Sequence, residues 1–149
     1  MARGVLSCAP DHALSCAAKI MWDHDCGSVP VVDERGKAVG MVTDRDICMA
    51  AFTRDLAPSQ MTVGSVCSRA LVAVREDESI EAAERLMQRH KVRRLPVIDA
   101  EGRPVGVLSI GDLARHARLD QRYRAGDIAP DGILTTLAAV STPAFVEHM

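Results

Sequence analysis

The feature that most constrains this sequence is an internal repeat. Sliding the chain by 66 residues aligns residues 5–47 with residues 71–113 without a gap. Eleven of the 43 aligned positions hold the same residue, whereas ordinary residue usage would give about three by chance. Conservative pairs, such as Ile20 with Leu86 and Thr43 with Ser109, extend the match. The chain is therefore predicted to contain two copies of one supersecondary unit.

Each copy begins with the pattern of a strand followed by a helix. Short apolar segments at 5–8 and 71–74 predict the strands, and Asp11 and Asp77 follow at positions that suit a helix N-cap. Apolar residues then recur at the i, i+3, i+7 spacing of one helical face. These are Leu14, Ala17 and Met21 in the first copy and Ile80, Ala83 and Met87 in the second.

A hairpin and a second helix complete each copy. The segments VPVVD and LPVID predict one strand, and AVGMV and PVGVL predict its partner. Gly36 and Gly102 lie in the intervening turns, where a positive φ is useful. Short helices are predicted at 44–52 and 111–117.

This pattern predicts an α+β fold of two β-α-β-β-α repeats. We expect domain 1 at 1–56, a linker at 57–65, domain 2 at 66–119 and a C-terminal tail with a short helix at 120–149. Aromatic residues make up only 3% of the chain, so the core must be mainly aliphatic. Because about 50 residues bury too little surface to be stable alone, the repeats are expected to pack as a pseudo-two-fold pair.

Composition argues against several classes of function. The net charge is −2, with 18 basic and 20 acidic residues, which gives no general attraction to nucleic acid or to an anionic membrane. No apolar run approaches the roughly 20 residues that span a bilayer, so a cytoplasmic protein is expected. There is no P-loop, nucleophile elbow or metal-ligand spacing, so neither catalysis nor a catalytic cofactor is expected.

The five cysteines leave two interpretations open. They are Cys8, Cys16, Cys26, Cys48 and Cys67, and no two have C-x-x-C spacing. Buried, reduced thiols that act as small hydrophobic side chains are one interpretation, and Cys48 in particular suits core packing. A redox-responsive or metal-responsive role is the other.

Each half of the chain resembles a CBS domain, and the two together resemble a Bateman module. The similarity is carried by VPVVD–ERGKAV–GMVTDRD and LPVID–AEGRPV–GVLSIGD and covers roughly residues 5–117. It implies a regulatory sensor that binds AMP, ATP, NAD or S-adenosylmethionine in the cleft between the repeats. It also implies a homodimer formed through the CBS helices and an unidentified effector protein. The alternative is an interaction scaffold with responsive cysteines and no nucleotide binding.

The resemblance assigns ligand-binding roles to Thr43, Asp46, Ser109 and Asp112, which lie where a strand leads into a helix. A carboxylate can accept hydrogen bonds from both hydroxyls of a ribose diol. The Ser or Thr hydroxyl and the first helical N–H groups can donate to a phosphate. The same S/T-x-x-D spacing also suits a capping box, and a cap can face a ligand at the same time.

Apolar strand residues before this motif are expected to flank the base. They are Val29 and Pro30 in the first copy and Leu95 and Pro96 in the second. The alternative interpretation is that they belong to the core.

The cations distinguish the two copies. Arg93 and Arg94 precede Leu95, whereas the matching positions 27 and 28 are uncharged, and Arg45 replaces a glycine of the second copy. A guanidinium suits a phosphate because its donors form a planar fork; a solvated helix end is the alternative. We therefore predict unequal sites, and the site with Ser109, Asp112 and Arg94 is the better candidate for a phosphorylated ligand.

Overall fold

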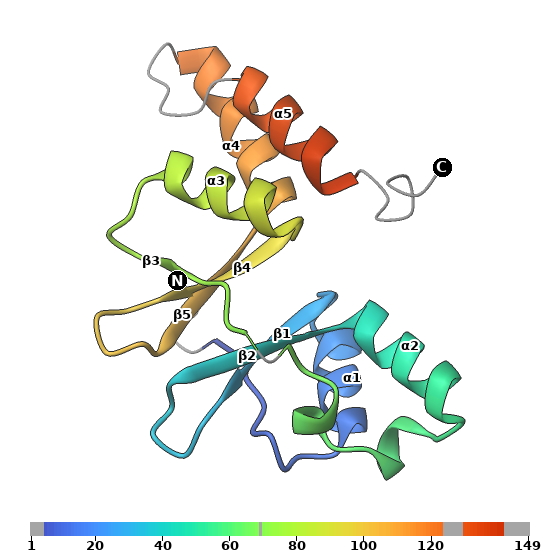
Figure 1. Ribbon diagram of the computed structural model, residues 1–149. Helices are drawn as coiled ribbons and strands as arrows, with labels where there is room; N and C mark the ends of the chain where they lie inside the picture. The colour runs from blue at the N-terminus through green and yellow to red at the C-terminus, as the bar shows by residue number, and fades with distance from the viewer. Residues whose placement is uncertain (1–4, 69, 124–129, 142–149) are drawn as a thin grey trace. The chain divides into compact units, whose positions relative to one another are not determined.

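The computed structural model describes residues 5–68, 70–123 and 130–141 (Figure 1). The chain forms two compact units. The first contains the residues up to Leu71 together with Ile98–Val107, and the second contains Val72–Val97 together with the chain from Leu108 onward. The hairpin tip of the second repeat therefore belongs to the first unit, where Ala38 N donates to Gly102 O at 2.9 Å.

The first unit is built from α1 (Leu14–Asp23), β1 (Ser28–Val32), β2 (Ala38–Thr43) and α2 (Asp44–Arg54). The strands are antiparallel, with Ser28 opposite Thr43. Their turn is closed by Asp33 Oδ1, which accepts from the N–H groups of Arg35 and Lys37 at 2.9 Å. Gly36 adopts the expected positive φ of 77°.

The predicted strand at 5–8 is wrong. Only Cys8 pairs, as an isolated parallel bridge to Val31. Residues 9–12 turn immediately afterwards, and His12 N donates to Ala9 O at 3.1 Å, so a strand cannot continue. Asp11 is likewise not the helix cap, because α1 begins at Leu14, three residues later, after Ala13.

The core of the first unit is aliphatic and includes part of the predicted linker. Leu14, Ala17 and Met21 are all buried, as their spacing predicts. The segment 57–65 forms two 3-10 turns, Pro58–Gln60 and Val63–Ser65. Met61 and Val63 from this segment are buried in the same core. Burial of apolar side chains thus binds this connection to the first unit.

The second repeat contains β3 (Val74–Arg75), α3 (Ile80–His90), β4 (Arg94–Ile98), β5 (Pro104–Ser109) and α4 (Ile110–Tyr123). Its strands form one sheet in the order β3-β4-β5. Of the predicted strand at 71–74 only Val74 lies in β3, and α4 is longer than the predicted 111–117.

Ser79, not Asp77, caps α3. The Ser79 hydroxyl accepts from Ala82 N at 3.2 Å, while Asp77 forms an ion pair with Arg75 at 3.0 Å. An N-cap side chain must reach the N–H of the second or third helical residue. Asp77 lies too far before Ile80 to do so.

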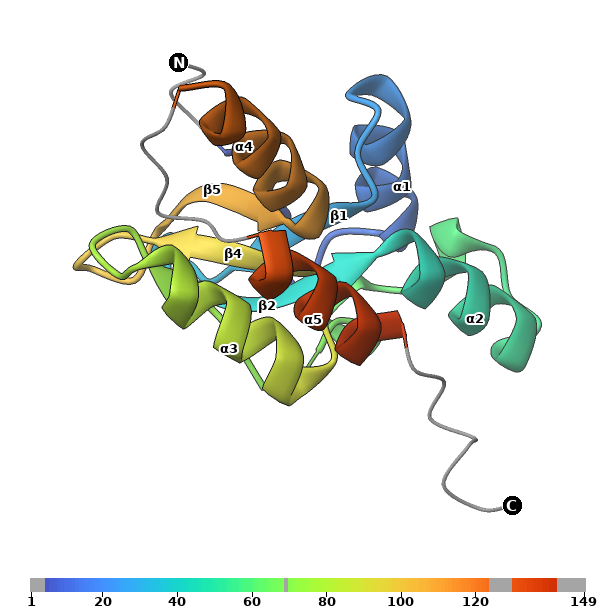
Figure 2. The same cartoon turned by 90° about the horizontal axis from the view of Figure 1, so that it is seen from above.

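The tail contributes α5 (Pro130–Ser141), which lies along α3 and α4 (Figures 1 and 2). Ile133, Thr136 and Val140 form its buried face. Gln88 Nε2 of α3 donates to Thr136 Oγ1 at 2.8 Å. The short helix expected in the tail is therefore present, and it covers helices of the second repeat.

Candidate functional site

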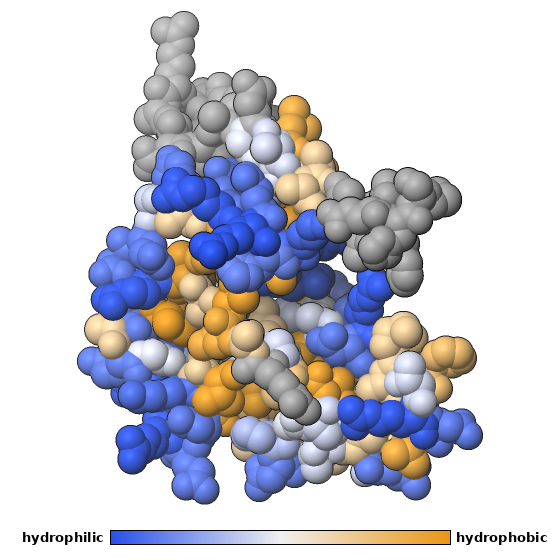
Figure 3. Space-filling view, viewed as in Figure 1, coloured by the Kyte–Doolittle hydropathy of each residue, from blue (hydrophilic) through white to orange (hydrophobic). Residues whose placement is uncertain are grey.

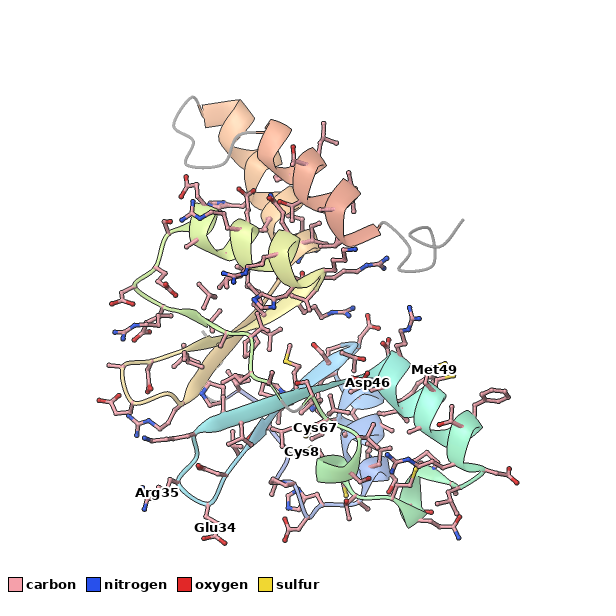
Figure 4. The ribbon with its side chains drawn as sticks, viewed as in Figure 1. Cys8, Glu34, Arg35, Asp46, Met49 and Cys67 are labelled. Carbon is pink, nitrogen blue, oxygen red and sulfur yellow. The ribbon has the colours of Figure 1, made fainter. Side chains whose placement is uncertain are left out.

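In the first repeat, Thr43 and Asp46 form a reciprocal capping box at the start of α2, where Asp46 is labelled in Figure 4. Thr43 N donates to Asp46 Oδ2 at 2.9 Å, and Asp46 N donates to Thr43 Oγ1 at 3.1 Å. Both side chains are half-buried. The cap uses one carboxylate oxygen, and among the residues that the structure describes Asp46 Oδ1 has no hydrogen-bond partner.

In the second repeat, Ser109 and Asp112 form a more highly connected cap. Ser109 donates to Asp112 Oδ2 through its N–H at 2.8 Å and through its hydroxyl at 2.7 Å. Asp112 N donates back to Ser109 Oγ at 3.1 Å, and Arg115 Nη2 donates to Asp112 Oδ1. Burial alone would raise the pKa of Asp112, but the bonds from Ser109 and the charge of Arg115 hold this pKa below its usual value.

The capping interpretation of S/T-x-x-D is therefore confirmed in both repeats. Backbone bonds join each helix start to the beginning of its hairpin: Asp44 N donates to Gly27 O, and Ile110 N donates to Arg93 O, both at 3.0 Å. In each hairpin, the beginning of the first strand therefore lies beside the helix start that carries the carboxylate.

The predicted cationic residues lie at these junctions. Arg93 immediately precedes β4, and Arg94 begins this strand at the position that Ser28 occupies opposite Thr43 in the first repeat. Arg93 is exposed and Arg94 is half-buried. Arg45 is exposed in the first turn of α2. Within the described residues, none of these three guanidinium groups forms an ion pair, so they remain available to an anion.

The apolar residues expected to flank a base are enclosed. Val29, Pro30, Leu95 and Pro96 all have buried side chains, and Val29 and Leu95 belong to the cores of their repeats. This agrees with their alternative interpretation as core residues. A contact between these residues and a base stays a prediction.

Sequence reasoning missed Arg115 and its counterpart Met49. Both lie three residues after the carboxylate, and Figure 4 shows Asp46 and Met49 along α2. The same offset of 66 residues, carried two residues past the aligned segment, pairs Met49 with Arg115, so the signal was available. It was overlooked because the compared motif ended at the aspartate.

The cysteines are less buried than expected. Cys8 is buried and Cys67 is half-buried, but Cys16, Cys26 and Cys48 are exposed, so the interpretation of all five as buried thiols is wrong. The core packing expected for Cys48 fails because α2 turns Ile47 and Ala50 inward instead. Burial raises the pKa of the Cys67 thiol, and the nearby charge of Asp46 adds to this rise against an opposing backbone hydrogen bond.

The described part of the chain contains neither a metal-ligand cluster nor a membrane-spanning helix. No group of three or more His, Cys, Asp or Glu side chains there could hold a metal ion. None of its helices combines the length and apolarity needed to cross a membrane.

The chain is similar to known proteins over about three quarters of its length. Hypoxic response protein 1 of Mycobacterium tuberculosis is 36% identical over 112 residues, which cover 74% of this chain and 78% of that protein. A crystal structure of Hypoxic Response Protein I with two coordinated zinc ions has a TM-score of 0.69 and 36% identity, and the match covers 78% of this chain and 93% of that one.

Two other structures contain adenosyl ligands. The CBS domain pair of protein MJ0100, in complex with 5′-methylthioadenosine and S-adenosyl-L-methionine, has a TM-score of 0.68 and 27% identity over 77% of this chain and 89% of that one. CBSX2 in complex with AMP has a TM-score of 0.68 and 28% identity, and the match covers 80% of this chain and 91% of that one.

The predicted α+β fold with two repeats is confirmed by these matches and by the helices and strands described above. The family profile described as the CBS domain matches twice, at residues 1–52 and 63–118. This chain therefore belongs to the CBS domain family and contains a tandem pair of CBS domains.

Proposed function

We propose that this CBS pair is a non-catalytic sensor that binds an adenosyl nucleotide, drawn from AMP, ATP, NAD and S-adenosylmethionine. The carboxylates of Asp46 and Asp112 accept the ribose hydroxyls. Thr43 and Ser109 directly precede α2 and α4, and the positive end of each helix dipole favours a phosphate there. Ligand binding alters the affinity of the pair for an effector, which requires different affinities of the ligand for two states.

The observation that carries this proposal is the open carboxylate oxygen of the first cap. Thr43 holds Asp46 through Oδ2, which orients the carboxylate before any ligand arrives. Asp46 Oδ1 remains for a hydroxyl donor. The structures of MJ0100 with adenosyl ligands and of CBSX2 with AMP support the ligand class.

Isothermal titration of the full chain with AMP, ATP, NAD and S-adenosylmethionine tests the proposal. We expect saturable heat with at least one ligand. Asp46→Asn should weaken binding by about 10- to 150-fold, because a hydrogen bond to a charged group contributes roughly 1.5–3 kcal/mol. Glu34→Gln is the matched control, since it removes one charge from an exposed hairpin turn (Figure 4). Absence of heat with all four ligands at millimolar concentration would exclude this function.

The proposed partner of the pair is a second copy, bound through α1 and α2. These helices contact each other, and each carries an exposed aromatic side chain: Trp22 is 87% exposed and Phe52 is 79% exposed. Apolar side chains are visible over α2 in Figure 3. An aromatic side chain buries about 150–250 Å², so four of them at a two-fold interface would supply about 600–1,000 Å². A standard interface buries about 1,200–2,000 Å² in total, so these four side chains would supply about half of it.

Light scattering after size exclusion tests this assembly. We expect a dimer for the wild type and a monomer for Trp22→Asp. Leu134→Asp is the control, because Leu134 is also exposed but lies on α5. A monomeric wild type, or loss of the dimer only in the Leu134 variant, would contradict the proposed interface.

A further inference from the structure

The two caps differ in what they leave for a ligand. In the first, Asp46 Oδ1 and the hydroxyl hydrogen of Thr43 have no hydrogen-bond partner among the described residues. In the second, the Ser109 hydroxyl donates to Asp112 Oδ2 at 2.7 Å, and Arg115 occupies Asp112 Oδ1. The first cap is open, whereas the second is satisfied by its own side chains.

Arg115 is the residue that closes the second cap. It stands three positions after Asp112 on α4, so the two side chains meet on one helix face. Arg115 is 73% exposed and Asp112 is 39% exposed. An ion pair in contact with water is weak enough to be exchanged for another. The first repeat has Met49 in this place, which carries no charge.

We propose that Arg115 is a specificity-determining residue that restricts the second site to adenosyl ligands bearing a phosphate. This inference rests on the proposed function, in which Asp112 receives the ribose. Arg115 already donates to Asp112 Oδ1, so a diol that approaches this oxygen competes with the guanidinium for it. A phosphate on the same ligand gives Arg115 a new anionic partner, and the planar guanidinium donates to it in fork geometry.

A ligand without phosphate provides no such exchange. With 5′-methylthioadenosine, Arg115 would lose its counter-charge beside the ligand. S-adenosylmethionine would bring a sulfonium cation close to the guanidinium, and like charges repel. The neutral Met49 imposes neither penalty in the first repeat. The two sites of the pair therefore differ in the ligand charge that they accept.

Titration of AMP, 5′-methylthioadenosine and S-adenosylmethionine against matched variants tests the inference. Arg115→Met copies the first repeat into the second. The second site is identified as the one whose binding is lost in Asp112→Asn. At this site Arg115→Met should lower the affinity for AMP by about tenfold, the change expected for one charge-assisted bond. The same substitution should raise the affinity for 5′-methylthioadenosine and for S-adenosylmethionine. Arg115→Lys should retain the preference for AMP, and Met49→Arg should introduce this preference at the first site.

Arg85→Met is the control, because Arg85 is exposed on α3 and lies outside the cap. It should leave all affinities unchanged. If Arg115→Met changes the affinity for all three ligands by the same factor, or if the wild-type second site prefers S-adenosylmethionine, the inference is wrong while the proposed function stands. If no adenosyl ligand binds the wild type, both are wrong. Met49→Arg keeps the test decisive should Arg115→Met unfold.

Discussion

Replacing Glu84 by Gln should stabilise the protein at neutral pH. Glu84 lies on α3 beneath α5, and a Cβ built at Gly132 of α5 would lie only 3.0 Å from Glu84 Oε2. Its Oε1 is enclosed and has no hydrogen-bond partner among the residues that the structure describes. Burial raises the pKa of this carboxyl, and the neighbouring charge of Glu81 adds to the rise. The ionised form is therefore the costly one.

Two opposing effects set the size of the change. A buried polar group without a partner costs about 1–3 kcal/mol, and we take the low end because the rest of the residue is only half-buried. The positive end of α5 would favour the carboxylate by about 0.3–1 kcal/mol. We expect desolvation to win by about 1 kcal/mol, which corresponds to a rise of roughly 2–4 °C in the unfolding temperature.

The pH dependence distinguishes this cause from others. Because the folded-state pKa of Glu84 is raised, its contribution to stability is fully present below the ordinary glutamate pKa of about 4.3 and is lost as pH rises through the folded value. The unfolding temperature of Glu84→Gln should therefore exceed that of the wild type at pH 7 and equal it near pH 4. A variant less stable than wild type at pH 7 would refute the reasoning and indicate that attraction to α5 dominates.

Three further changes follow from local geometry. Gly40→Ala should cost about 1–3 kcal/mol in the free energy of unfolding, because the new Cβ would lie 2.7 Å from Ser68 O; an unchanged urea midpoint would contradict this. Gly111→Ala should instead stabilise by up to about 1 kcal/mol, since its Cβ would meet nothing closer than 3.5 Å; thermal unfolding checks the sign. Asp112→Asn should be less stable than wild type at pH 7, and thermal unfolding should show this difference shrinking as pH falls below the ordinary aspartate pKa of about 3.9, because the lowered pKa of Asp112 gives a contribution that is lost as pH falls through the folded-state value.

Most of the fold was predictable because the repeat gives two readings of each element. Both hairpins, both glycine turns and the apolar stripes of α1 and α3 follow from spacing that occurs twice. The strand at 5–8 and the caps at Asp11 and Asp77 were wrong, and the strand at 71–74 was too long, although these patterns also occur twice. Repetition shows that a feature is shared, but hydrogen-bond geometry determines whether it is a strand or a turn.

The coverage of α3 and α4 by α5 could not be predicted, because the tail has no counterpart in the repeat. Ile133, Thr136 and Val140 form a helical stripe, yet a stripe does not identify the surface that it meets. The bond from Gln88 to Thr136 joins residues 48 positions apart. The matching residue of the first repeat is the exposed Trp22. The same helical position thus contacts α5 in one repeat and is open to a partner in the other.

The candidate site also combines a feature that both repeats share with one that differs between them. Ser or Thr with Asp three residues later builds a cap in both repeats, and this could be predicted because the two side chains bond within one helical turn. Whether the second carboxylate oxygen is free depends on the next turn of the helix, where one repeat has Met49 and the other has Arg115. A motif that ends at the aspartate describes two equivalent caps. One further helical turn makes them chemically different, because only Asp112 bonds to a guanidinium, that of Arg115.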